Sequence, residues 1–278
     1  MGSYFPIPPN IKIGLLEHKI IGSLTLLNYP NNHKKNNEHK ISKKDIYVGI
    51  YILRSNLWFL CKIEKCGFKE FKEITRDNLA ISDYEMAVAV IKKINNFPKS
   101  CDQLPIPDTL RIDKAPVAER TSFNFSYKNF QTSFQGEFPI QMAKLSHSTF
   151  FGFDALKGIG DKSKIKNFIL LMNLNISSKR NNMDKVKIYD PNTKKVLYEL
   201  MAKENLISVH DISELYDNNF LQKILFLSSK SFSYIALMMS LDLNSKQFSL
   251  EHTHPPAEMA NGMDRYQIVK PLKKNWII

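Results

Sequence analysis

The sequence consists largely of short segments rich in β-branched and aromatic residues, and this succession constrains the fold more than any other feature. Turn-forming residues separate the segments: Arg54-Ser55-Asn56, for example, lies between residues 46–53 and residues 57–63. Two extended segments joined by a short polar connection are typical of a β-hairpin. A second hairpin is predicted for residues 186–200, where a Pro-Asn pair marks the turn. Because strands do not alternate with long helical segments, the sequence predicts a mainly β (α+β) fold with antiparallel sheets.

One segment of the first half favours a helix. Ser82 and Glu85 match the Ser-x-x-Glu capping box, which is typical of a helix N-terminus. Apolar residues then recur at helical spacing at Ala87, Val90, Ile91 and Ile94. Asn95-Asn96 and Pro98 would end this helix. The first half is therefore predicted to be a strand meander with one helix, and its strands are expected at residues 11–16, 20–28, 46–53, 57–63 and 68–74.

The proline content predicts a division into two domains. Residues 1–113 are predicted to form an α+β domain with a mobile Lys- and Asn-rich loop at residues 30–45. Residues 118–278 are predicted to form an antiparallel β-sandwich-like domain. The boundary is placed in the extended, proline-rich segment at residues 98–116. Strands of the second domain are expected at residues 121–138, 166–176, 186–189, 196–200, 220–227, 232–243 and 247–254, with a helical turn at 211–215.

Composition excludes several classes of protein. A hydrophobic content of 43% in 278 residues is ample for a packed core and argues against general disorder. Three cysteines, Cys61, Cys66 and Cys101, argue against a disulfide framework and favour a reducing compartment. No apolar run approaches the length of a membrane span, and the N-terminus does not have the pattern of a signal peptide. We therefore expect a soluble, cytoplasmic protein without a membrane partner. The net charge of +12 is spread along the chain, which favours a solvated surface but also suits a nucleic-acid partner.

Residues 121–138 alternate aromatic residues with neutral polar residues. Phe123, Phe125 and Tyr127 would share one face of a strand, and amide and hydroxyl side chains, including Gln135, lie between the aromatic positions. This alternation is typical of a strand pair with one face in the core. It also suits a carbohydrate or another polar ligand, because aromatic rings stack on sugar rings while amides bind the sugar hydroxyls. We therefore keep Phe123, Phe125, Tyr127 and Gln135 as candidate ligand-binding residues.

Residues 247–258 hold the densest group of reactive side chains. His252 and His254 lie two residues apart on a predicted strand, so their imidazoles would point to the same side. With Glu258 they form the pattern His-x-His-x-x-x-Glu, which resembles the first half of the cupin metal motif. Lys246 stands where that motif has a glycine, and no second histidine motif follows. The resemblance implies one divalent metal ion held by His252, His254 and Glu258.

A second resemblance concerns Gly158-Ile159-Gly160, which is followed by basic residues. It is similar to the hairpin of helix-hairpin-helix modules, whose glycine amides bind a nucleic-acid phosphate. The alternative is a glycine-rich turn between strands. The sequence contains no nucleophile elbow, P-loop, dinucleotide fingerprint or His-Glu-x-x-His motif. An enzymatic activity is left open, because active sites also assemble from residues distant in the sequence.

The sequence thus supports three hypotheses. The first is a non-catalytic binding or accessory protein with a β-sandwich that recognises a glycan-like polar ligand. The second is a metal-dependent, cupin-like enzyme centred on His252, His254 and Glu258. The third is a nucleic-acid-binding protein.

Overall fold

The structure is a computed structural model of the whole chain and describes residues 2–28, 45–108, 121–136, 138–140, 150–154, 164–189, 193, 195–215, 224–229 and 234–252. The predicted loop at residues 30–45 falls outside these ranges except for its last residue, and the predicted domain boundary between residues 113 and 118 falls outside them entirely.

Eighteen strands make up the described part of the fold. In the first half they are β1 (Ser3–Pro6), β2 (Ile21–Leu27), β3 (Ile46–Arg54), β4 (Leu57–Cys66), β5 (Phe71–Thr75), β6 (Ala87–Lys92), β7 (Ser100–Cys101), β8 (Ser122–Tyr127), β9 (Phe130–Gln135) and β10 (Phe138–Pro139). In the second half they are β11 (Phe150–Asp154), β12 (Ile165–Met172), β13 (Met183–Tyr189), β14 (Val196–Lys203), β15 (Ile207–Asp211), β16 (Ile224–Ser228), β17 (Ile235–Asp242) and β18 (Phe248–His252). The helical turn predicted near residue 213 is present as η1 (Ser213–Leu215).

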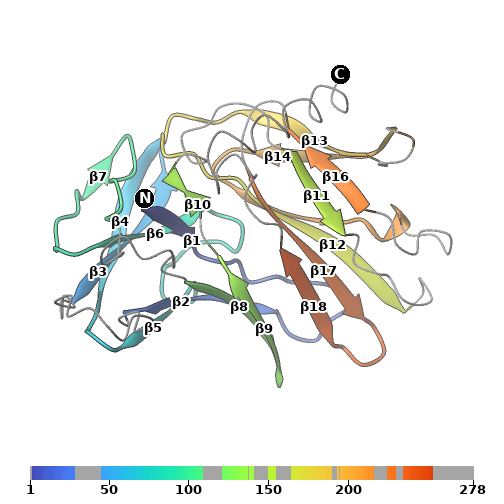
Figure 1. Cartoon of the computed structure of the whole chain (residues 1–278), viewed down its shortest axis with the longest axis horizontal. Coiled ribbons are helices and arrows are strands. Elements are labelled where there is room, and N and C mark those ends of the chain that lie inside the picture. Colours follow the sequence, from blue (N-terminus) through green and yellow to red (C-terminus); the bar gives the residue numbers. More distant parts are fainter. Residues whose placement is uncertain are drawn as a thin grey trace, which may run out of the picture.

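The strands form four antiparallel sheets. The first half contains the sheets β10-β1-β6-β3-β4-β7 and β5-β2-β8-β9, and the second half contains β11-β16-β13-β14 and β15-β12-β17-β18. Figure 1 shows the first-half sheets on the left and the second-half sheets on the right. The chain passes between the two second-half sheets several times, and between β14 and β15 it does so through a short turn. The predicted mainly β, sandwich-like architecture is therefore confirmed.

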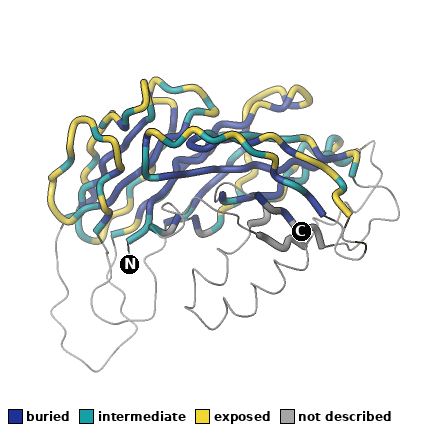
Figure 2. The backbone as a smooth tube through the Cα atoms, turned by 90° about the horizontal axis from the view of Figure 1, so that it is seen from above, coloured by how far each residue is buried: buried dark blue, intermediate teal, exposed yellow. Residues whose placement is uncertain are grey.

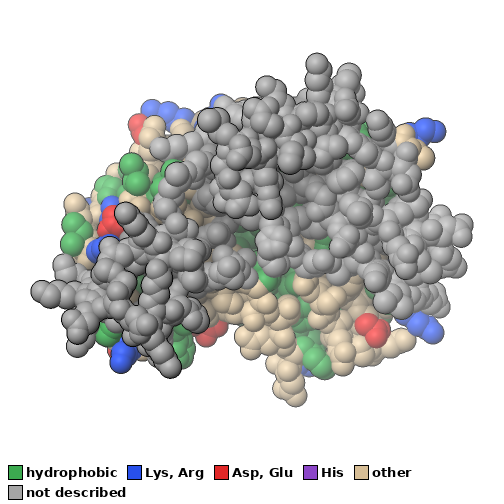
Figure 3. Space-filling model, in the orientation of Figure 1, with side chains coloured by type: hydrophobic (Ala, Val, Ile, Leu, Met, Phe, Trp, Pro, Cys, Tyr) green, Lys and Arg blue, Asp and Glu red, His purple; other side chains and the backbone are tan. Residues whose placement is uncertain are grey.

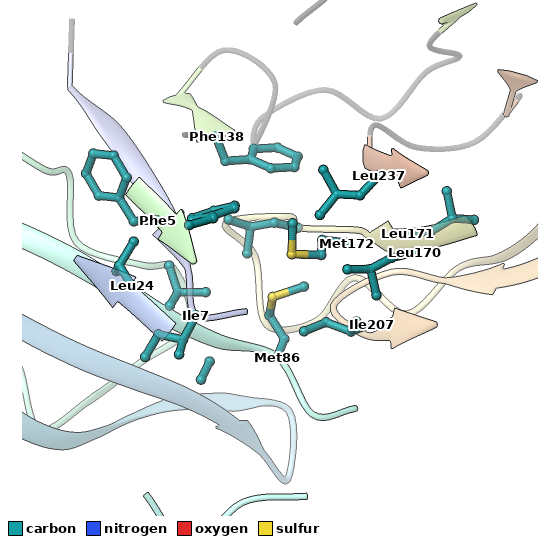
Figure 4. Packing of buried hydrophobic residues seen from close by; sticks show 14 of the residues in the cluster. Phe5, Ile7, Leu24, Met86, Phe138, Leu170, Leu171, Met172, Ile207 and Leu237 are labelled. Atoms are coloured by element: carbon teal, nitrogen blue, oxygen red, sulfur yellow. The ribbon is translucent and has the colours of Figure 1, made fainter. Parts of the chain in front are cut away.

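One hydrophobic core extends through both halves. Its members include Phe5 and Leu24 from the first half and Leu170, Met172 and Leu237 from the second. Figure 4 shows these side chains facing one another across the junction, and Figure 2 shows buried backbone running through the middle of the molecule. Burying apolar surface is the main favourable term in folding, so the two halves stabilise each other.

Hydrogen bonds add to this contact between the halves. The Trp58 indole Nε1 and the Leu104 amide both donate to the carbonyl oxygen of Ile176, at 2.9 Å and 3.0 Å. The Ile207 amide donates to the Tyr84 carbonyl oxygen at 3.0 Å. These bonds join residues at least seventy positions apart in the sequence, and they fix the orientation of one half against the other.

The predicted helix is wrong. The Ser82 amide does donate to Glu85 Oε2, at 2.5 Å, as in a capping box, but the bond closes a turn and the chain then continues as strand β6. β6 lies between β1 and β3, and its residues are buried on both faces. A central strand buried on both faces consists of consecutive apolar residues, and such a run also satisfies helical spacing. The two β-branched valines and Ile91 favour the strand.

The remaining strand predictions agree at most positions. The hairpin of β3 and β4 turns at Ser55 and Asn56, both with positive φ (48° and 59°), as a two-residue hairpin requires. The strand predicted at residues 11–16 is wrong, because that segment contributes only a single bridge between Ile11 and Ile20. Strand β1 was not predicted, since it ends at Pro6, and Pro8 and Pro9 follow closely. No helix in the described ranges is long and apolar enough to cross a membrane.

Candidate functional site

The three aromatic residues proposed as a ligand platform lie in the core. Phe123 and Phe125 are fully buried and Tyr127 is 2% exposed. The Phe134 ring packs edge-on against Phe123 at 5.5 Å between centroids and parallel to Phe125 at 6.1 Å. Gly136 leaves the space that the Phe123 ring occupies, since a Cβ there would come within 2.2 Å of the ring. A sugar ring therefore cannot stack on these side chains, and the prediction that they form an exposed platform is wrong.

The opposite face of the same strand pair carries the neutral polar side chains. Cross-strand pairs place Asn124 beside Ser133, Ser126 beside Gln131, and Ser122 beside Gln135. We call these six residues of β8 and β9 the polar face. Gln131 and Ser133 are exposed, whereas the side chain of Gln135 lies outside the described set. In Figure 3 the surface over β8 and β9, in the lower middle of the view, is mostly neutral.

Asn124 anchors this face through a hydrogen-bond network that crosses three strands. Its Nδ2 donates to Thr25 Oγ1 at 2.8 Å, and its Oδ1 accepts from Ser122 Oγ at 2.9 Å. Ser23 Oγ, 3.4 Å from the same Nδ2, donates in turn to Glu73 Oε1 at 2.6 Å. A side chain held by several bonds keeps one orientation. The polar groups on β2, β5 and β8 are therefore fixed in place before any ligand arrives.

The two segments singled out from the sequence lie close together. β9 and β18 are edge strands of different sheets and contact each other. Figure 1 shows them side by side in the lower middle of the molecule. The polar face is thus next to the strand that ends at His252.

The metal hypothesis stays a prediction. His252 is the last residue of β18 and pairs with Leu237 of β17, but its side chain lies outside the described set, as do His254 and Glu258. Among the side chains that are described, no group of three His, Cys, Asp or Glu residues could hold a metal ion. Gly158, Ile159 and Gly160 also lie outside the described ranges, so the nucleic-acid hypothesis is not tested either.

All three cysteines are free thiols. Burial raises the pKa of Cys66 and of Cys101, so both remain protonated at neutral pH and are poor nucleophiles. Cys61 is exposed and lies opposite the register shift between β3 and β4. This arrangement favours structural thiols over a thiol-based active site.

A buried polar network that the sequence analysis did not single out holds the junction. Asn205 is 1% exposed and has a positive φ of 58° in the turn after β14. Its Oδ1 accepts from the Asn175 amide at 2.8 Å, and its Nδ2 donates to the carbonyl oxygens of Ser177 and Arg180 at 3.1 Å and 3.3 Å. Glu204, 2% exposed, lies 3.4 Å from Arg180 Nε. The network positions the loop that contacts Trp58 and Leu104.

We expect Asn205→Ala to lower the free energy of unfolding by about 2–3 kcal/mol, because it removes three hydrogen bonds and strains a residue with positive φ. Asn205→Gly removes the bonds without the strain and should cost about 1 kcal/mol less. The matched control is Asn56→Ala, at an exposed turn with φ 59°. It should cost only about 1 kcal/mol. Urea unfolding of the three variants checks this, and equal losses for Asn205→Ala and Asn56→Ala would contradict the network.

Two buried tyrosines predict an alkaline dependence of stability. Burial, and to a smaller extent the charge of Cys101, raises the pKa of Tyr4 and of Tyr51. The hydroxyl of Tyr51 donates to the Pro98 carbonyl oxygen at 3.0 Å, whereas that of Tyr4 has no hydrogen-bond partner among the described residues. Above the unfolded pKa of about 10, the unfolded state loses these protons first. Stability contributed by both groups is therefore complete below pH 10 and falls as pH rises above it.

The contrast between the two hydroxyls is testable. Tyr4→Phe should leave stability at pH 7 unchanged or raise it by about 1 kcal/mol, because it removes an unpaired buried hydroxyl. Tyr51→Phe should cost about 1 kcal/mol. Both variants should lose less stability than the original chain between pH 9 and pH 11, around the unfolded pKa of about 10. Chemical denaturation across this range is the measurement, and an unchanged slope would contradict the burial of the two hydroxyls.

Comparisons with known proteins add little. No protein-family model and no curated protein sequence matches the chain. Among solved structures, the chain is similar to the major pilin from Streptococcus pyogenes, in its unmutated form and as two mutants. Each is 10% identical with a TM-score of 0.24, over 84% of this chain and 92% of the pilin chain. At this TM-score the likeness carries no argument about function.

Proposed function

We propose that the protein is a non-catalytic binding or accessory protein that recognises a neutral, glycan-like polar ligand on the polar face of β8 and β9. The observation that carries the proposal is the arrangement of neutral amide and hydroxyl side chains in cross-strand pairs above a packed aromatic layer. The aromatic rings are the rigid support of the site and do not contact the ligand.

The chemistry of these side chains suits a polyol. An amide offers two donors and an acceptor, and a hydroxyl offers a donor and two lone pairs, which matches the mixed donors and acceptors of sugar hydroxyls. Asn124 is already held by Thr25 and Ser122. A face that is ordered beforehand loses less conformational entropy on binding. Gln131 and Ser133, exposed on the edge strand β9, are the residues that we expect to contact the ligand first.

The proposal includes a cytoplasmic location, supported by three free thiols. Metal binding by His252, His254 and Glu258 is retained as a separate hypothesis, since His252 ends the strand β18 that contacts β9. Elemental analysis of untagged protein tests it: absence of stoichiometric metal removes it.

The experiment for the proposed function is a calorimetric screen of neutral mono- and oligosaccharides. The double variant Gln131→Ala/Ser133→Ala should bind the selected saccharide about tenfold more weakly, because two hydrogen bonds of about 0.5–1.5 kcal/mol each are lost. The control is Gln103→Ala, an exposed glutamine that follows β7 and pairs with Ser177, outside the polar face, and this variant should bind like the original chain. A chain that binds no saccharide, or a double variant that binds normally, would contradict the proposal.

A further inference from the structure

Strand β14 forms a free edge of its sheet in the described part of the second half. β14 is eight residues long and is the last strand of its sheet, where it pairs only with β13 among the described strands. A long unpaired edge exposes backbone donors and acceptors to any other extended chain, and proteins commonly shield such edges.

The pairing geometry identifies which backbone groups are free. The Glu204 amide donates to the Asn182 carbonyl oxygen at 2.9 Å, in register with the pairs of β13 and β14. Bonded pairs alternate along an antiparallel ladder, so Glu199, Met201 and Lys203 direct their backbone groups away from β13. The Lys203 carbonyl oxygen already accepts from Asn173 Nδ2 at 3.1 Å. The backbone groups of Glu199 and Met201 have no partner on that side among the described residues.

Apolar side chains gather on this ribbon. Of the thirteen large hydrophobic side chains that are exposed in the described ranges, four lie on β13 and β14, and they are Met183, Val196, Tyr198 and Met201. Met201, at 50% exposure, lies in the middle of the free edge, between Glu199 and Lys203. An apolar residue flanked by opposite charges is suited to a partner that presents the same three residues in reverse order.

We propose that β14 pairs antiparallel with β14 of a second copy of this chain, across a twofold axis at Met201. The pairing joins two four-stranded sheets into one continuous sheet. A twofold interface brings the same surface of each copy together, so it must be self-complementary. This dimer is independent of the proposed ligand face.

The choice of axis follows from the pleat and the charges. Opposite residues in a sheet must point to the same side, so the axis passes through a residue and not between two. An axis at Glu199 would place two carboxylates opposite each other, and an axis at Leu200 would place Glu199 opposite Met201. An axis at Met201 places Glu199, which also pairs with Lys185 of its own copy at 2.6 Å, opposite Lys203 of the second copy, twice. Opposite charges in directly opposed positions are favourable and like charges are unfavourable.

A disulfide scan tests the axis. In a Cys61→Ser background, which removes the exposed native thiol, Met201→Cys places two thiols across the axis with Cα atoms about 5.5 Å apart, within reach of a disulfide. The control is Met183→Cys, which is more exposed (64%) but lies on β13. Its two copies would be three strand spacings apart across the sheet and four residues apart along it, roughly 20 Å in all. Mild oxidation should cross-link Met201→Cys and not Met183→Cys. Equal cross-linking of both, or of neither, overturns the proposal.

Charge reversal tests the pairing without any cross-link. Glu199→Lys and Lys203→Glu should each weaken dimerisation by about tenfold, since each places like charges opposite one another twice. A one-to-one mixture of the two variants should restore a dimer, because every contact between unlike copies then joins opposite charges. Mass measurement by light scattering reads out the result, with circular dichroism to confirm folding. An original chain that stays monomeric up to millimolar concentration, or a mixture that stays monomeric, overturns the proposal.

Discussion

Phe125→Ala should lower the free energy of unfolding by about 3–5 kcal/mol, the usual cost of removing a fully buried aromatic ring. The ring lies in the core, stacks on Phe134 at 6.1 Å between centroids, and stands opposite Gly22 of β2. Gly22 has no side chain to fill the space left behind. A Cβ at this position would lie only 2.3 Å from the Pro9 carbonyl oxygen. Urea unfolding measures the loss.

The matched control for this prediction is Ser133→Ala, on the other side of the same strand pair. Ser133 is exposed and opposite Asn124, so the change should alter stability by less than about 0.5 kcal/mol. The two variants together test which side of the β8–β9 pair faces the core. A mild effect of Phe125→Ala would mean that the aromatic side faces solvent. Phe123, Phe125 and Tyr127 would then again be candidates for direct contact with a ligand.

Arg76→Met should be about as damaging, at about 3–4 kcal/mol. Arg76 is 2% exposed, and its guanidinium donates to the carbonyl oxygens of Ile7, Pro8 and Ser82 at 2.8 Å, 2.9 Å and 2.9 Å. These bonds tie the segment after β1 to the loop before β6. Methionine fills much of the volume but leaves three carbonyl oxygens without their donor, and each such group costs about 1–3 kcal/mol when buried. Relief of the buried charge offsets part of the loss.

The buried charge at this position is itself costly. Burial lowers the pKa of Arg76 to about 10, although Asp83 and Glu85 partly counteract the shift. Arg76→Lys keeps a charge but cannot reproduce the guanidinium fork, so it should also be destabilising. The control is Arg54→Met, because Arg54 donates to the Ala80 carbonyl oxygen at 3.0 Å on the exposed surface. Thermal unfolding should show a change below about 0.5 kcal/mol for Arg54→Met. Similar losses of stability for Arg76→Met and Arg54→Met would contradict a structural role for the three hydrogen bonds of Arg76.

Local signals in the sequence accounted for the elements that local chemistry determines. The turn at Ser55 and Asn56 was predicted because turn-forming polar residues separate two runs rich in β-branched and aromatic residues. The alternation in β8 was predicted because its period is set by the pleat. The wrong prediction of a helix at β6 arose because local signals do not determine this segment. Its position between β1 and β3 decides its conformation, and that position depends on pairing with distant residues.

The candidate site could be predicted only in part for the same reason. The neutral polar residues of β8 and β9 were noted from the sequence, but their network depends on Ser23 and Thr25, about a hundred positions away. Arg76 bonds to residues 68 and 69 positions earlier in the chain. Asn205 donates a hydrogen bond to Ser177, which lies in a loop. The sequence shows this loop only as polar residues that follow a strand. No pattern of neighbouring residues in the sequence indicates such long-range contacts.

The most direct test of the proposed ligand face is amide chemical-shift mapping of the labelled protein with the saccharide that the screen selects. We expect shifts to concentrate at residues 122–126 and 131–135, Gln131→Ala/Ser133→Ala to abolish them, and residues 196–203 not to respond. Shifts confined to another part of the chain, or the absence of any saccharide that shifts these amides, would contradict the proposed ligand face.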